Sequence, residues 1–320
     1  MQVHPGLAAL RRDDTPQRQA QAALAATQSQ WEATSEVRAV LAGLERMAEG
    51  AELADCPELA ALFAPGPAAQ RFAQAFISTM CGALAERPLG HVPLRHFTDG
   101  ANSTLLLGRS GPVALTLVAL DAAGLARKPA PRSVTLSPAF TWEAVVGGGG
   151  SIELVHALPL PGGTARLERE TRALTPGMAY QRDGREQGLI YRSVDGCLVV
   201  LRLQRRLAGD GVVREYDLAD GTLLHRANGS PLASRYELMA TLLGRMGRSD
   251  AAPLLADLAT EEGASGMRWQ ALRECLGLHT AAGFAALDVI ARRTADPLAP
   301  SAGALRAQLV ESWPQLAEIA

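Results

Sequence analysis

Apolar residues recur at helical spacing through the first ninety residues of the chain. One such stretch runs from Ala20 to Trp31, and another lies between residues 69 and 85, ahead of Pro88. Between them the same spacing joins Val37, Leu41, Leu44 and Met47. Steps of three and four residues place apolar side chains on one face of a helix. We therefore expect a helical segment over residues 1–90.

The hydrophobic period changes from 3.6 to 2 between residues 91 and 230. Short segments rich in Val, Leu, Ile and Thr are separated there by pairs such as Asp183-Gly184 and Asp195-Gly196, which are typical of tight hairpins. Gly147 to Gly150 are expected to form a flexible turn. The predicted strands are Ser103–Leu107, Val113–Leu120, Ser133–Leu136, Trp142–Val146, Ile152–Ala157, Thr164–Glu170, Leu189–Ser193, Cys197–Leu203, Val212–Leu218 and Thr222–His225. Such a series, with no helix inside it, predicts an antiparallel barrel or sandwich.

Helical spacing returns after residue 230. The sequence from Ser234 to Glu237 has the capping-box pattern of a helix start. A shift of 33 residues superposes Tyr236 on Trp269, Leu243 on Leu276, Gly244 on Gly277 and Leu254 on Leu287. A period of this length with two helices per unit is typical of stacked helical hairpins. The whole pattern predicts an α+β protein, with an antiparallel β barrel or jelly roll over residues 91–230 and a helical-hairpin array over residues 231–320.

Composition argues against several classes of function. The 320 residues carry 31 Lys plus Arg against 33 Asp plus Glu, and this formal net charge of −2 argues against a nucleic-acid partner. Lys128 is the only lysine, and its context matches neither a phosphate-binding loop nor the strand lysine of a protein kinase. The preference for arginine is most simply explained by a GC-rich bacterial genome. With no signal-peptide pattern and no long apolar stretch, we expect a soluble cytoplasmic protein with no membrane partner.

Parts of the β region resemble cupins. Ser137–Gly148 and Ser151–Leu154 resemble the first conserved cupin stretch, in which a strand, a glycine turn and a returning strand follow the metal-binding histidines. Leu174–Tyr180 resembles the proline-glycine turn that opens the second stretch. The helices after residue 230 resemble HEAT-type repeats in the same way. These resemblances imply a cupin-like barrel followed by a HEAT-like helical array.

The histidines depart from the pattern of metal-binding cupins. Those cupins carry His-x-His, a nearby Glu and a later His, a ligand set that suits iron, manganese or zinc. At the matching positions, only Glu143 has a residue type that could be a ligand. The resemblance then implies a barrel that has lost its usual metal site, with no cofactor. The alternative is one divalent transition metal, Fe, Zn or Mn, held by rearranged ligands drawn from His91, His96, Asp99, Glu143 and His156.

Arginines supply a second candidate site. Arg182 and Arg185 lie in the loop that would face the mouth of a cupin barrel, and Arg202 lies in an arginine-rich neighbouring hairpin. Planar guanidinium groups bind carboxylates and phosphates through two parallel hydrogen bonds. These three residues are therefore candidates for anion binding. The alternative is an ordinary surface of salt bridges with nearby carboxylates.

Three functions are compatible with these features. The first is a non-catalytic binding or accessory protein whose barrel holds a small ligand or peptide and whose helices beyond Ser234 engage a protein partner. The second is a metal-dependent cupin-like enzyme, an oxygenase or isomerase, with the rearranged ligands. The third is a sensor that binds an anionic metabolite through the three arginines. The missing cupin histidines favour the first, which has no catalytic residue.

Overall fold

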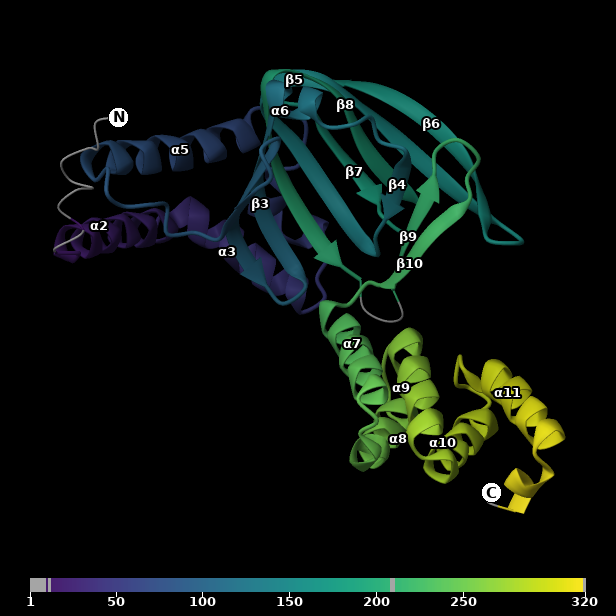
Figure 1. Cartoon of the computed structure of the whole chain (residues 1–320). Coiled ribbons are helices and arrows are strands. Elements are labelled where there is room, and N and C mark those ends of the chain that lie inside the picture. The colour runs from purple at the N-terminus through teal and green to yellow at the C-terminus, as the bar shows by residue number, and fades with distance from the viewer. Residues whose placement is uncertain (1–9, 11–12, 208–210, 319–320) are drawn as a thin grey trace. The chain divides into compact units, whose positions relative to one another are not determined.

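The computed structural model of the protein describes residues 10, 13–207 and 211–318 (Figure 1). The chain divides into two compact units. The first comprises Met1–Leu207 and Tyr216–Thr222, and the second comprises Ala208–Glu215 and Leu223–Ala320. The N-terminal helices and the large sheet thus share one unit, and the domain boundaries expected at residues 90 and 230 stay predictions.

The N-terminal helices cover one face of the large sheet. They are α2 (Thr15–Glu32), α3 (Ser35–Ala48), η1 (Leu53–Asp55), α4 (Pro57–Ala61) and α5 (Ala68–Glu86). The ring of Trp31 lies 5.7 Å from that of Phe72, centroid to centroid, which joins α2 to α5. Leu44 and Phe72 share one buried cluster with Leu115 and Leu203 of the sheet. The helices predicted from the apolar spacing are therefore confirmed.

Ten strands are described, and they form antiparallel ladders. They are β1 (His96–Thr98), β2 (Asn102–Ser110), β3 (Val113–Asp121), β4 (Ser133–Leu136), β5 (Ala139–Leu160), β6 (Thr164–Leu174), β7 (Ala179–Asp183), β8 (Gln187–Arg206), β9 (Val212–Asp217) and β10 (Leu223–Asn228). The larger sheet has the order β1-β2-β3-β8-β5-β6, with β7 also paired to β5, and the smaller one has the order β10-β9-β4. The predicted α+β fold with antiparallel strands is confirmed.

One helix interrupts the strands, contrary to the expectation of a helix-free region. This helix, α6 (Ala122–Arg127), begins directly after β3. The carboxylate of Asp121 accepts a hydrogen bond of 2.6 Å from the backbone N–H of Gly124. A side chain that caps the first helical turn in this way allows a short helix to form where strand propensity has ended.

The turns predicted at Gly147–Gly150 and at Asp195-Gly196 are wrong, because β5 and β8 continue through these segments. The ladder between β5 and β8 continues past Gly147–Gly150 and past Asp195-Gly196, with register shifts near Gly147 and Gly149. Gly148 has a φ of 77°, and a Cβ on it would lie 1.9 Å from the carbonyl oxygen of Cys197. Glycines at such bulges bend a strand and let the partner backbone approach closely. Here they bend both long strands without breaking their pairing.

The C-terminal unit consists mainly of helices. They are α7 (Pro231–Arg245), η2 (Ser249–Ala251), α8 (Ala252–Thr260), α9 (Ser265–Leu278), α10 (Thr280–Arg292), α11 (Ala299–Ser312) and η3 (Pro314–Glu318). Their core includes Leu272, Phe284 and Ile290. The predicted helix start at Ser234 is wrong by one turn, because Ser230 is the capping residue and its hydroxyl accepts from the N–H of Ala233. The HEAT-like character of these helices stays a prediction.

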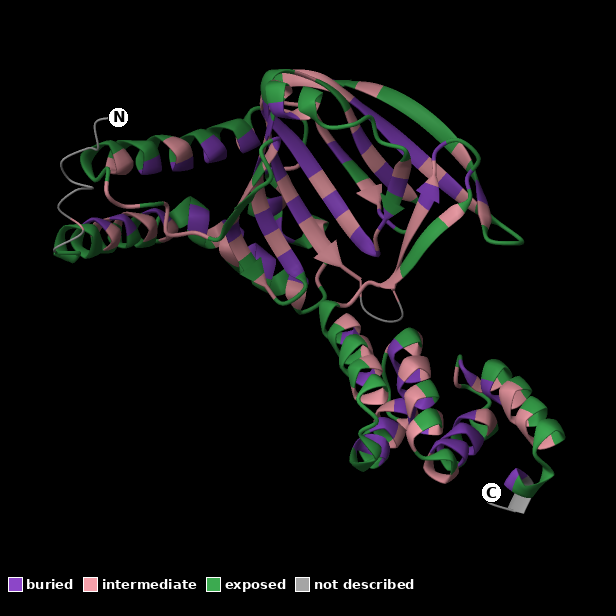
Figure 2. Ribbon diagram, viewed as in Figure 1, coloured by how far each residue is buried: buried purple, intermediate pink, exposed green. Residues whose placement is uncertain are grey.

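Figure 2 shows the buried positions that alternate along the strands and line the helices. Among the described helices, none has both the length and the apolar character needed to cross a membrane.

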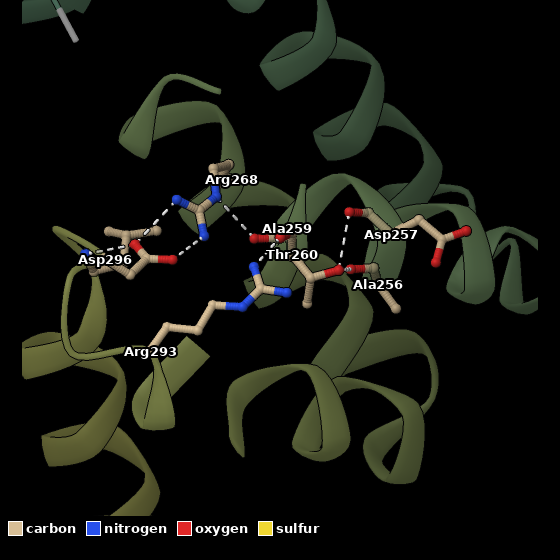
Figure 3. Close-up of polar contacts among 8 residues, drawn as sticks. Ala256, Asp257, Ala259, Thr260, Arg268, Arg293 and Asp296 are labelled. Carbon is tan, nitrogen blue, oxygen red and sulfur yellow. Dashed lines mark hydrogen bonds and ion pairs between the residues drawn. The ribbon is translucent and has the colours of Figure 1, made fainter. Parts of the chain in front are cut away.

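An ion pair lies inside the helical unit (Figure 3). The guanidinium of Arg268 on α9 donates to both carboxylate oxygens of Asp296, and its Nε donates to the carbonyl oxygen of Ala259 at 3.0 Å. The side chains of Arg268 and Asp296 are only 6% and 7% exposed. The pair joins the end of α8 to the loop before α11, and the Arg268 guanidinium holds the pKa of Asp296 below its usual value.

Substitution Gly148→Ala should destabilise the sheet. The added Cβ meets the backbone of Cys197, and the positive φ strains any other residue, so we expect the free energy of unfolding to fall by at least about 2 kcal/mol. Gly147→Ala is the matched control, because a Cβ there meets nothing within 4 Å. Urea unfolding followed by circular dichroism measures both variants. Equal stability of the two would contradict the close strand approach.

Substitution Arg268→Met should destabilise the helical unit. It leaves the carboxylate of Asp296 buried without its partner, and we expect a loss of about 3 kcal/mol in the free energy of unfolding. Arg248→Met removes the exposed pair with Asp250 and should leave the unfolding midpoint unchanged. Calorimetry of the whole chain compares the variants. An unchanged transition in the Arg268 variant would show that the buried pair does not stabilise this unit.

Candidate functional site

The face of the large sheet opposite the N-terminal helices carries a group of polar side chains. Side chains alternate between the two faces of a strand. Ala144 and Leu201 pack toward the helices, whereas Val145 and Val200 belong to a separate cluster on the other face. Glu143 and Arg202 share the alternation of Val145 and Val200, so they lie on the face away from the helices.

Strand pairing brings these residues together. Glu143 on β5 lies opposite Arg202 on β8 and opposite Tyr180 on β7, and the next pair on this face joins Thr141 to Arg182. The bend of β8 adds Tyr191, whose hydroxyl accepts a hydrogen bond of 3.1 Å from Nη2 of Arg202. We name this group the Glu143 cluster: Thr141, Glu143, Tyr180, Arg182, Tyr191 and Arg202.

Glu143 lies at the centre of the cluster and has no exposed surface. Its Oε1 accepts from Nε of Arg202 at 2.7 Å, whereas its Oε2 lies 3.8 Å from Nε of Arg182, beyond hydrogen-bond distance. Burial by itself would raise the pKa of Glu143, but the charges of Arg202 and Arg182 outweigh it and hold the pKa below its usual value. The carboxylate is therefore ionised at neutral pH.

The tyrosines of the cluster stay protonated at neutral pH. Burial raises the pKa of Tyr191 to about 12, and the neighbouring Glu143 charge adds to this effect. Burial and Glu143 raise the pKa of Tyr180 further still. Two arginines, one carboxylate and two neutral phenols leave the cluster with one net positive charge.

Hydrogen bonding in the cluster is incomplete. Among the residues that the structure describes, four of its buried side-chain atoms have no partner within hydrogen-bond distance and angle: Thr141 Oγ1, Glu143 Oε2, Tyr180 OH and Arg182 Nε. The guanidinium of Arg182 donates no hydrogen bond to any described residue. Because buried polar groups are almost always paired, a concentration of unpaired atoms at adjacent positions needs an explanation, such as a missing water, ion or ligand.

The three anion candidates from the sequence have different surroundings. Arg182 and Arg202 enter the Glu143 cluster. Arg185 does not, because its guanidinium is 54% exposed, pairs with Asp183 through two oxygens and lies 5.4 Å from the centre of the Phe140 ring. It forms the kind of surface ion pair that the alternative prediction described.

The five metal candidates are not brought together. His91 and His96 are exposed, and Asp99 lies 2.7 Å from the ammonium of Lys128, whose hydrogen bond lowers the pKa of Asp99 to about 2. His156 lies 3.5 Å from a carboxylate oxygen of Glu186. Glu143 is held by arginines instead. Over the residues that the structure describes, no three His, Cys, Asp or Glu side chains converge as a metal site would require.

Sequence reasoning named Glu143, Arg182 and Arg202, but missed Thr141, Tyr180 and Tyr191. The alternation of side chains along β5 places Thr141 on the same face as Glu143, so the sequence alone is enough to predict that Thr141 is near the site. The two tyrosines depend on the register of β7 and on the bend of β8, which the sequence pattern does not reveal.

Comparisons with known proteins do not assign this chain to a family. No protein-family model matches the chain, and no curated protein matches it significantly. Among solved structures, HutD from Pseudomonas fluorescens is 16% identical, with a TM-score of 0.25, over 36% of this chain and 57% of HutD. The matched part thus spans a little over half of HutD.

Two further solved structures are similar at the same level. DMSP lyase DddQ from Ruegeria pomeroyi is 16% identical, with a TM-score of 0.26, over 41% of this chain and 62% of that one. A sugar phosphate isomerase from a cupin superfamily, from Silicibacter pomeroyi, is 15% identical, with a TM-score of 0.24, over 40% and 78%. The fold rests on this chain's own strand pairing, and TM-scores near 0.25 say nothing of its chemistry.

Substitution Glu143→Gln should destabilise the protein in a pH-dependent way. Because folding lowers the pKa of Glu143, its contribution is complete above the unfolded pKa, near 4.5, and is lost as the pH falls through the folded pKa. We expect the variant to lose about 3 kcal/mol at pH 7, where two buried guanidinium groups lose their carboxylate, and the difference to shrink below about pH 4.

Urea unfolding across this pH range measures the difference between wild type and variant. Glu168→Gln, on the exposed surface of β6, is the control and should leave stability unchanged at every pH. A difference for Glu143→Gln that is independent of pH would contradict the ionised, arginine-held carboxylate.

Proposed function

We propose that the protein binds a small anionic ligand at the Glu143 cluster and that Arg182 is the residue that contacts the anion. The observation that carries this proposal is the state of Arg182. Its side chain is only 15% exposed, yet it donates no hydrogen bond to a described residue. A buried guanidinium without hydrogen bonds is costly unless another partner satisfies it.

The three arginines of the sequence prediction divide into different roles. Arg202 is held by Glu143 and Tyr191, and Arg185 is held by Asp183. Arg182 alone of the three loses no hydrogen bond to a described residue when it turns toward a ligand. The net positive charge of the cluster matches one negative charge on that ligand.

The protonation states favour binding over proton transfer. Phenols that stay protonated at neutral pH donate hydrogen bonds to an anion, but they do not act as general bases. The ionised Glu143 serves as counter-ion to the arginines. We therefore keep the non-catalytic binding protein as the proposed function. The metal-dependent oxygenase or isomerase remains the alternative hypothesis.

The partner-binding part of the function also remains a proposal. It is supported by an exposed row along α7 and its C-cap residue, where apolar residues follow one another at helical spacing: Leu232, Tyr236, Met239, Leu242 and Met246. An apolar stripe of this kind is the form in which helices commonly meet protein partners.

Calorimetric titration at pH 7 tests the anion proposal. The probes are propionate, lactate, succinate, malate and inorganic phosphate, each added to the full chain. We expect at least one to bind, and Arg182→Gln to weaken its affinity by about tenfold or more, because a charge-assisted hydrogen bond is lost. Arg185→Gln is the matched control on the same hairpin and should bind like the wild type. If no probe binds, or both variants bind equally well, the proposal is wrong.

A further inference from the structure

We infer that the anion bound at the Glu143 cluster carries a hydroxyl group beside its charged group, so that its class is a small 2-hydroxy acid. This inference rests on the proposed function and adds the identity of the ligand class. It follows from which atoms of the cluster lack partners, and from what each of those atoms can donate or accept.

The unpaired atoms occupy adjacent positions on paired strands. Thr141 lies opposite Arg182, and Glu143 lies opposite Tyr180, both between β5 and β7. Neighbouring cross-strand pairs on one face lie within reach of a single small molecule. Nε of Arg182 and Oε2 of Glu143 lie 3.8 Å apart. One compact ligand can therefore serve both atoms.

The chemistry of these atoms restricts the ligand. Nε–H of Arg182 only donates, and the ionised Oε2 of Glu143 only accepts, whereas the hydroxyls of Thr141 and Tyr180 do either. A ligand that only accepts, such as a simple carboxylate, offers no donor to Glu143 and leaves it dependent on the neighbouring hydroxyls of the cluster. A neutral polyol satisfies Glu143 but leaves the net positive charge. A carboxylate with a hydroxyl meets both requirements.

The proximity of the two atoms favours adjacent groups on the ligand. Nε of Arg182 and Oε2 of Glu143 lie 3.8 Å apart, and a carboxylate and a hydroxyl on neighbouring carbon atoms place an acceptor and a donor at a similarly short spacing. The four atoms are closed to solvent, so Arg182 turns aside to admit the carboxylate. Val118, Val145 and Val200 lie on the same face and are apolar, which suits contact with a short carbon chain.

Matched ligand pairs test the inference by calorimetric titration of the full chain. Lactate and propionate, and malate and succinate, differ only in the hydroxyl, and both enantiomers of each hydroxy acid are used. We expect the preferred enantiomer to bind at least about tenfold more tightly than its partner without the hydroxyl, because that partner offers no donor to the buried Glu143 carboxylate.

Two variants locate the preference in the cluster. Tyr180→Phe removes one unpaired hydroxyl at nearly constant volume and should reduce the preference at least about threefold. Glu143→Gln exchanges the acceptor-only carboxylate for an amide and should reduce it further. Thr135→Val, an exposed position on β4, is the control and should keep the wild-type preference. Circular dichroism confirms that each variant is folded.

The outcomes distinguish a failure of the proposed function from a failure of the hydroxy-acid inference alone. If no anion binds, the proposed function fails, and this inference fails with it. If both members of each pair bind equally, the proposed function stands and the hydroxy-acid inference is overturned. Glycerol, titrated in the same way, is the neutral probe: if it binds as tightly as lactate, the charge is not recognised and both are overturned. A hydroxyl preference that survives in Tyr180→Phe and Glu143→Gln also overturns the inference, because it then arises elsewhere.

Discussion

The site depends on a charge that is buried. Glu143 has no exposed surface, and a carboxylate in that position is tolerated only with cations beside it. Arg202 supplies the direct hydrogen bond, and Arg182 stands 3.8 Å away as a second cation. Since one carboxylate neutralises one of them, the arrangement that stabilises Glu143 also leaves a guanidinium for another anion.

Backbone geometry makes that arrangement possible. β5 and β8 each bend at glycine-containing bulges and remain paired on both sides of the bend. The positive φ of Gly148 and its contact with the backbone of Cys197 admit no side chain. Because of the bend, Tyr191 from the first half of β8 reaches Arg202 in the second half. The residues of the cluster come from three strands that local sequence alone does not bring together.

Much of this fold was predictable from the sequence, and the failures have physical reasons. Helical and alternating spacing identified the helical segments and the antiparallel strands. The Asp195-Gly196 pair predicts a hairpin where the structure has a bulge, because a glycine with positive φ occurs in both. The capping-box pattern predicts a start of α7 at Ser234, although Ser230 also has a capping hydroxyl and precedes a proline at the first helical position.

The sequence predicts residues of the site only as members of two separate candidate sites. Glu143 was named as a candidate metal ligand, and Arg182 and Arg202 as candidates for anion binding, in two separate hypotheses. Only the register of β7 and β8 against β5 shows that the three are neighbours.

A crystal structure of the protein grown with malate tests the central claim most directly. The account predicts density for malate at the Glu143 cluster, with its carboxylate on Arg182 and its hydroxyl within hydrogen-bond distance of Glu143. Density for malate elsewhere, with Arg182 still beside Glu143 and the cluster unchanged, would contradict it.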